Sequence, residues 1–221
     1  MEQMTVTELY TLKETIASEI FAGVTYPWEV LPKIGAFIVK LGSTLPETEY
    51  EKIGEDIWVA KSAKVAATAS IHGPAIIGKE AEIRHCAFIR GNAIVGEGAV
   101  VGNSTELKNV ILFNKVQVPH YNYVGDSILG YKSHMGAGAV TSNVKSDKSL
   151  VKVKVGEKTI ETGLKKIRGN AGGRGGSRLW KCAESRKCDW KSYKHLSSFH
   201  GARSDSSGKY LQKQGEIVAK Q

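Results

Sequence analysis

The sequence contains no run of about 18 uncharged apolar residues, the length that a membrane-spanning helix requires. Its first residues, Met1 to Leu12, also lack the basic stretch followed by an apolar stretch that marks a secretory signal peptide. These two absences argue against an integral membrane protein and against a secreted protein. We therefore expect a soluble, cytoplasmic protein that has no membrane partner.

Cysteine is also scarce: the 221 residues include 3, and Cys86, Cys182 and Cys188 form no Cys-x-x-Cys pair. An odd number of cysteines without paired spacing argues against a disulfide framework and against a zinc ribbon. The sequence therefore predicts free thiols in a reducing compartment.

Acidic residues are few in one segment, which accounts for most of the net charge of +9. Residues 169–213 contain ten Lys and Arg but three Asp and Glu, a net charge of +7 that leaves +2 for the other 176 residues. A basic protein is ordinarily a candidate for nucleic-acid binding. Because the charge is confined to one atypical segment and the rest is nearly balanced, we expect no nucleic-acid partner.

What the sequence does contain is an internal repeat of six residues. Aliphatic residues recur at this spacing nine times in succession, at Val59, Val65, Ile71, Ile77, Ile83, Ile89, Val95, Val101 and Leu107. Small residues form a second series at the same spacing, at Ala63, Ala69, Ala75, Ala81, Ala87, Ala93, Ala99 and then Thr105. Two such series are not expected by chance and indicate a repeat architecture.

A period of six matches neither the 3.6 residues of an α-helical turn nor the alternation of a strand that ends in a hairpin. It is typical of short parallel strands joined by tight turns, three of which form a triangular coil of about 18 residues. The aliphatic residue of each repeat then points to the axis, and the small residue allows the chain to turn. We therefore predict an all-β fold over residues 51–145, a single-stranded parallel β-helix of hexapeptide repeats.

The regions beside the repeat have other patterns. Residues 1–50 contain apolar positions at helical spacing and predict a small α-helical N-terminal region that caps the first coil. Residues 146–168 contain valines that alternate from Val151 to Val155 and predict a β-hairpin excursion.

The six-residue register slips after Leu107. The aliphatic residues that follow form two offset series, Leu112, Val118 and Val124, and then Leu129 and Met135. A slip of this kind is typical of a bulge or of a loop that leaves the coil, and loops on a rigid scaffold often bind ligands. We expect a bulge or a loop here.

Arg90 and Lys108 are 18 residues apart, which is one coil, so we expect them to stack on one face roughly 4.8 Å apart in backbone terms. Two adjacent cations repel each other unless an anion binds, which indicates a phosphate or pyrophosphate site. The alternative, two solvated surface charges that bind nothing, fits the spacing equally well.

The residues around this pair also form a longer motif. Twelve residues after Lys108 comes a His followed by x-x-Tyr-x-Gly-Asp, which spans His120 to Asp126, and Asn143 follows later. The stretch from Arg90 to Asn143 resembles the acetyltransferase domain of the bifunctional enzymes that make UDP-N-acetylglucosamine. The resemblance implies that the β-helix is left-handed and that acetyl-CoA is the co-substrate; it does not identify the residues that bind acetyl-CoA.

The resemblance also assigns roles to residues. It implies that Arg90 and Lys108 bind the phosphate of an amino sugar phosphate and that Tyr123 and Asn143 bind the sugar. It further implies that His120 is the general base that takes a proton from the sugar amine, a role that suits the imidazole group at neutral pH.

The chain departs from that family at two positions. His134 stands where the family has a sugar-binding Asn, and Val144 stands where it has a Tyr. We keep His134 among the expected substrate-binding residues and leave the identity of the sugar open. The chain resembles still more closely the short sugar-nucleotidyltransferase-like proteins, related to UDP-N-acetylglucosamine pyrophosphorylase. No Gly-rich nucleotide-binding loop occurs near the N-terminus, so these residues give no support to a pyrophosphorylase activity.

The predicted function is that of an acetyl-CoA-dependent acyltransferase. It would act on an amino sugar phosphate similar to glucosamine 1-phosphate, or on a nucleotide sugar. The alternative is a non-catalytic β-helix that binds a sugar nucleotide or regulates a partner. The resemblance also implies a homotrimer, in which neighbouring β-helices supply the other wall of each cleft.

We expect no metal site. Some left-handed β-helix proteins bind zinc as carbonic anhydrases, through histidines from adjacent coils. The candidates here lack the closely spaced His pair that such sites use. They are His72, His85, His120 and His134.

Residues 169–213 break the repeat, because they are basic, rich in Gly and Ser, and poor in aliphatic residues. One interpretation is a disordered or RNA-binding tail. We favour a frame shift that begins near Arg168 and is compensated near Gln214, since plausible codons read one base later encode hexapeptide repeats again. Residues 214–221 would then be a normal C-terminal end. Because each coil needs a neighbour to stack on, we predict that residues 169–213 form no coil and leave the chain catalytically weak.

Overall fold

The computed structural model describes residues 4–141, 150–155 and 158–165. Within residues 169–219 it further describes the backbone of five short strands. The predicted sugar-binding residue Asn143 and its neighbour Val144 lie outside the described residues.

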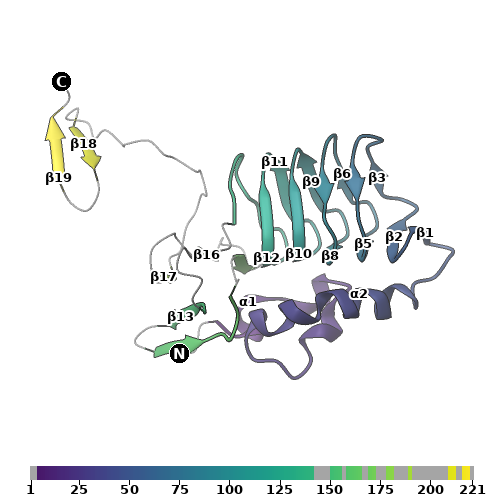
Figure 1. The fold of residues 1–221 in the computed structure, drawn as a ribbon, viewed down its shortest axis with the longest axis horizontal. Coiled ribbons are helices and arrows are strands. Elements are labelled where there is room, and N and C mark those ends of the chain that lie inside the picture. The colour runs from purple at the N-terminus through teal and green to yellow at the C-terminus, as the bar shows by residue number, and fades with distance from the viewer. Residues whose placement is uncertain are drawn as a thin grey trace.

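Residues 57–141 wind into a parallel β-helix of about four coils and part of a fifth, whose strands lie on three faces (Figure 1). The first face consists of β2 (Ile57–Ala60), β5 (Ala75–Ile77), β8 (Ala93–Val95) and the second halves of β10 (Glu106–Leu112) and β12 (Tyr123–Leu129). The second face consists of β3 (Lys64–Val65), β6 (Glu82–Ile83), β9 (Val100–Asn103) and β11 (Gln117–His120). The third face consists of β4 (Ser70–Ile71), β7 (Phe88–Ile89) and the first halves of β10 and β12. Neighbouring strands on each face are parallel, so the predicted fold class is confirmed.

The aliphatic series fills the axis of the β-helix. Ile77, Ile83 and Ile89 lie on successive faces of one coil and are at most 1% exposed. Full burial of a side chain of this size stabilises a fold by about 1.5–3 kcal/mol, so the repeated series contributes substantially to stability. The series is less well covered where no coil precedes it, and Val65 in the first coil is 40% exposed.

The register slip arises because the coil becomes one residue shorter. Ala75 pairs with Ala93, an interval of 18, whereas Ala93 pairs with Val110, an interval of 17. The corner after Leu107 has two residues where the corner after Ile89 has three, and β10 passes through it as one continuous strand. Of the two expected features, a bulge or a loop, no loop leaves the coil in this fully described stretch; the slip is a shortened corner within one strand.

The N-terminal region forms a layer of short helices. They are α1 (Val6–Leu9), η1 (Leu12–Glu14), η2 (Ser18–Phe21), η3 (Pro27–Lys33) and α2 (Ile34–Gly42). The α2 helix packs on β5, β8 and β10, and η3 packs on β12, so the layer runs along the first face (Figure 1). Trp28, Ile34 and Ile38 are each at most 2% exposed and belong to the same core as the strands.

The predicted helical region is thus confirmed, but its position differs from the cap on the first coil that we expected. It covers the length of one face, and β1 (Tyr50–Gly54) pairs antiparallel with β2 at the end of that face. Two hydrogen bonds join the layer to the later coils: Tyr10 Oη donates to the Ile128 carbonyl at 3.3 Å, and the Asn114 N–H donates to the Glu14 carbonyl at 3.0 Å. Burial raises the pKa of Tyr10 well above its ordinary value, so this hydroxyl remains a donor.

The segments after the β-helix contain further strands. β13 (Lys152–Val155) and β14 (Lys158–Glu161) pair antiparallel within the region for which we predicted a hairpin. β15 (Gly169–Gly172) adds to β12 in parallel, but β16 (Arg178–Lys181) and β17 (Asp189–Trp190) follow it antiparallel, unlike the strands of a coil. β18 (Lys209–Gln212) and β19 (Glu216–Ala219) pair with each other. Much of residues 169–213 lies outside the described residues, so the absence of a coil there stays a prediction.

None of the helices in the described part of the chain is long and apolar enough to cross a membrane.

Candidate functional site

Four of the predicted site residues come from successive coils at or beside the third face. Arg90 directly follows β7, Lys108 lies in β10, Tyr123 opens β12, and His120 ends β11 at the turn that leads into β12. Lys108 and Tyr123 are half-buried, and Arg90 and His120 are exposed. The repeat thus brings residues that are up to 33 positions apart in the sequence to one region of the surface.

Arg90 and Lys108 occupy equivalent positions in adjacent coils. Ile89 pairs with Leu107, and the Arg90 N–H continues this ladder by donating to the Leu107 carbonyl at 2.8 Å. Lys108 in turn pairs with Gly125 in the next coil. The residue that follows both cations in this column, Gly125, therefore has no side chain.

The charge of Arg90 is already paired. Its guanidinium Nη1 lies 2.6 Å from Glu106 Oε1, and the two side chains are 43% and 32% exposed. The hydrogen bond to the Glu106 carboxylate raises the pKa of Arg90 above its ordinary value. A partly exposed pair of this kind contributes little to stability. A phosphate that binds Arg90 would have to share this guanidinium with Glu106 or displace it.

Tyr123 lies against Gly125 in its own strand. A Cβ atom built on Gly125 would be 2.5 Å from Tyr123 Oη and 2.8 Å from its Cζ, so the ring occupies the space that a side chain at this position would need. This contact explains physically why the motif has Gly two residues after Tyr. The next motif residue, Asp126, is 8% exposed and accepts a hydrogen bond from Asn109 Nδ2 at 2.9 Å, a structural role between adjacent corners.

The turn that contains His120 is held by its backbone. The His120 N–H donates to Asn122 Oδ1 at 3.1 Å, and the His120 carbonyl accepts from the Gly138 N–H at 3.0 Å. Its side chain is exposed. We did not identify Asn122 from the sequence, although the shortened coil of 17 residues places it directly after Thr105 in the small-residue series.

His134 continues the face that contains β11, the strand that His120 ends. It pairs with Gln117 through an isolated bridge and so continues the second face, whereas Tyr123 is on the third face. The structure therefore places His134 on a different face from Tyr123, on the face whose last strand ends at His120.

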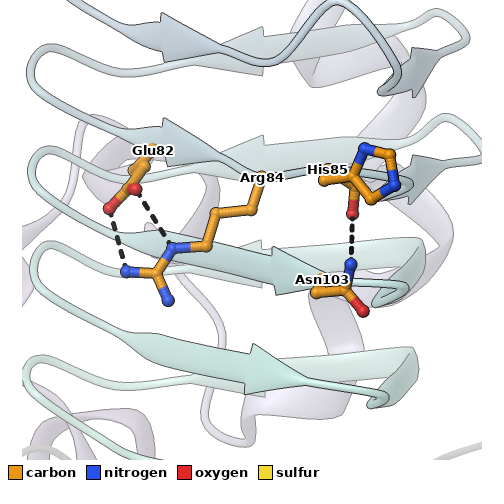
Figure 2. A network of polar contacts seen from close by, with 4 residues as sticks. All are labelled: Glu82, Arg84, His85 and Asn103. Atoms are coloured by element: carbon orange, nitrogen blue, oxygen red, sulfur yellow. Dashed lines mark hydrogen bonds and ion pairs between the residues drawn. The ribbon is translucent and has the colours of Figure 1, made fainter.

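Other polar side chains of the second face contact one another. Arg84 donates two hydrogen bonds of 3.1 Å to the Glu82 carboxylate, and Asn103 Nδ2 donates to the His85 carbonyl at 3.2 Å (Figure 2). The bond from Arg84 lowers the pKa of Glu82. The His85 ring lies 2.6 Å from Thr68 Oγ1 through Nδ1. Among the residues that the structure describes, no group of three or more His, Cys, Asp or Glu could hold a metal ion.

The chain matches known families over its β-helix. Residues 71–160 match the family model of the GMPPB C-terminal domain. The bifunctional protein GlmU of Methanocaldococcus jannaschii is 40% identical over 62 residues, which are 28% of this chain and 15% of that protein. A bifunctional sugar-1-phosphate nucleotidylyltransferase/acetyltransferase of Sulfurisphaera tokodaii is 36% identical over 73 residues, 33% of this chain and 18% of that protein.

A solved structure, the acetyltransferase domain of PglB from Neisseria gonorrhoeae FA1090, is 18% identical, with a TM-score of 0.26 over 39% of this chain and 49% of that chain. The matched part spans less than a fifth of the length of the curated relatives named above. The chain thus contains a hexapeptide β-helix region that is similar to parts of GlmU-type bifunctional enzymes and to the GMPPB C-terminal domain.

Proposed function

We propose that the protein is an acetyl-CoA-dependent acyltransferase. Its acceptor is an amino sugar phosphate similar to glucosamine 1-phosphate, or a nucleotide sugar. The observation that supports this proposal is the arrangement of four side chains. Arg90, Lys108 and Tyr123 follow one another through three coils at the third face, and His120 projects from the turn just before Tyr123. The cations Arg90 and Lys108 suit the phosphate of such an acceptor, and the base His120, in a later coil, suits its amine.

In this proposal His120 accepts a proton from the sugar amine while the nitrogen attacks the thioester carbonyl carbon of acetyl-CoA. The bond between carbon and sulfur breaks, the acetyl group remains on the nitrogen, and the thiolate of coenzyme A takes up a proton. Imidazole is suited to this step because its usual titration range spans neutral pH. Lys108 and Arg90 hold the phosphate, and Tyr123 packs beside the sugar.

A second candidate is a β-helix that binds a sugar nucleotide without turnover. Two observations favour it: the family model that matches residues 71–160 is that of the GMPPB C-terminal domain, and Glu106 already neutralises Arg90. Release of free thiol from acetyl-CoA across a panel of amino sugar phosphates separates the two candidates. Ligand binding measured by calorimetry without thiol release would favour the second. Because Cys86 is a free and exposed cysteine, any signal from protein thiols must be subtracted with a sample that lacks acceptor.

Lys108→Ala should raise the KM for the sugar phosphate about tenfold and leave kcat nearly unchanged, because a charged hydrogen bond of about 1.5–3 kcal/mol is lost from the bound substrate. Steady-state kinetics at varied acceptor concentration measure both constants. Lys115→Ala is the matched control, since Lys115 is an exposed lysine at a different corner of the β-helix. Equal KM values for Lys108→Ala and the unmodified chain would show that Lys108 does not bind the phosphate.

We also expect three copies to associate in solution, as the resemblance implies. The helical layer covers the first face, so copies would meet through the second and third faces or the corners beside them. Multi-angle light scattering after size exclusion, at micromolar concentration, should give three times the mass of one chain, 24.0 kDa. A mass of one chain would contradict the homotrimer.

A further inference from the structure

One core position changes character in the coil that contains His120. The small-residue position just before the third face is Ala87 in the second coil, Thr105 in the third, Asn122 in the fourth and Ala139 in the fifth. Asn122 is 2% exposed. Burial of an amide side chain costs free energy unless its polar atoms are hydrogen-bonded, so a position that is alanine in the second and fifth coils needs a reason to contain one.

All the polar atoms of the Asn122 side chain have partners. Oδ1 accepts from the His120 N–H at 3.1 Å, and Nδ2 donates to the Gly136 and Ala139 carbonyls at 2.8 and 3.0 Å. Two carbonyl acceptors on one side and an N–H donor on the other allow a single orientation of the amide. The Asn122 N–H also lies 3.4 Å from Thr105 Oγ1. The side chain therefore joins the His120 turn to the following coil, and the backbone of the same residue contacts the preceding one.

The His120 backbone is consequently held at both polar atoms, because the Gly138 N–H donates to its carbonyl as well. The equivalent turn of the second coil has Ala87 at the buried position, which offers no side-chain acceptor to the His85 N–H. The buried amide thus occurs at the turn whose histidine belongs to the candidate site, while the turn with His85 lacks it.

We propose that Asn122 is a positioning residue that fixes the backbone of His120 and thereby aims its imidazole at the acceptor amine. This inference rests on the proposed function, in which His120 is the general base. Asn122 acts through His120, since its side chain is buried in the axis and contacts the backbone rather than the exposed face. A reacting geometry displaced by about 1 Å can reduce a rate by as much as a hundredfold, so loss of this contact should be visible in kcat.

Asn122→Ala is the test. The substitution restores the alanine that the second and fifth coils have at this position, so we expect the coil to form. We expect kcat per folded protein to fall about tenfold or more, while the KM for the sugar phosphate stays within about twofold. Hydrogen exchange followed by NMR should show that the His120 amide loses protection, whereas amides in β9 keep theirs.

A double-mutant cycle with His120→Ala distinguishes positioning from a general structural role. If Asn122 acts through the imidazole, Asn122→Ala should cause no further loss of kcat in the His120→Ala background. Equal losses in both backgrounds would overturn the inference. Ile94→Val is the control for stability alone, because Ile94 is fully buried on the first face and the change costs about 0.5–1.5 kcal/mol without affecting His120.

The possible failures are separable. Normal kcat in Asn122→Ala, combined with loss of activity in His120→Ala, would overturn the positioning role and leave the proposed function intact. Full activity in His120→Ala would instead contradict the proposed base and, with it, any positioning role for Asn122.

Discussion

His120→Ala should lower the rate of acetyl transfer at saturating substrate by about a hundredfold or more, since loss of a general base typically removes a factor of 10² to 10⁴. The fold should remain intact, because the His120 side chain is exposed and the hydrogen bonds of this residue are made by its backbone. The KM for the sugar phosphate should change little. Initial rates of thiol release at saturating acceptor and acetyl-CoA measure the effect.

His85→Ala is the matched control for this prediction. His85 occupies the position two coils earlier that corresponds to His120, and it too is exposed. Its replacement should leave kcat within about twofold. A His120→Ala protein as active as the unmodified chain would rule out the proposed mechanism, whatever the binding data show.

Gly102→Ala should be among the most destabilising substitutions of one small residue by another in this chain. A Cβ atom on Gly102 would overlap the carbonyl oxygen, carbonyl carbon and Cα of Pro119 in the adjacent coil. These are backbone atoms of paired strands, β9 and β11, so neither can move without breaking the ladder between them. Overpacking that forces backbone shifts costs about 3 kcal/mol or more, and the free energy of unfolding should fall by that amount.

Chemical denaturation monitored by circular dichroism tests the Gly102 prediction. Gly54→Ala is the control, because its new Cβ would meet the flexible end of the Ile57 side chain at 3.2 Å and no closer atom. This control should lose less than about 1 kcal/mol. Similar unfolding free energies for the two variants would mean that adjacent coils lie farther apart at this corner than the structure shows.

The regular part of this fold was predictable because its period appears directly in the sequence. Nine aliphatic residues at an interval of six determine the parallel strands, the buried axis and the number of residues in the first coils. The same periodicity placed Arg90 and Lys108 in adjacent coils, since an interval of 18 residues returns the chain to one corner. Periodicity of this kind requires no knowledge of long-range contacts.

The departures from regularity were not predictable from the same pattern. The loss of one residue after Leu107 resembles a bulge in the sequence, but in the structure it joins two strands into one. The position of the helical layer depends on which face offers the best apolar surface, and helical spacing does not reveal that. Nor does spacing show that Glu106, two residues before Lys108, would contact Arg90 rather than solvent.

The helical layer along the first face also affects how the molecule unfolds. In an unsupported solenoid each coil contacts its immediate neighbours, so stability is close to a sum of local terms and coils can fray singly from an end. Here Tyr10 is bonded to Ile128, a contact across 118 residues, while α2 touches strands of three different coils. Unfolding of one coil therefore exposes part of the helical layer and weakens the packing of that layer on the remaining coils. The layer makes the unfolding of the coils cooperative, at the cost of the slower folding that long-range contacts impose.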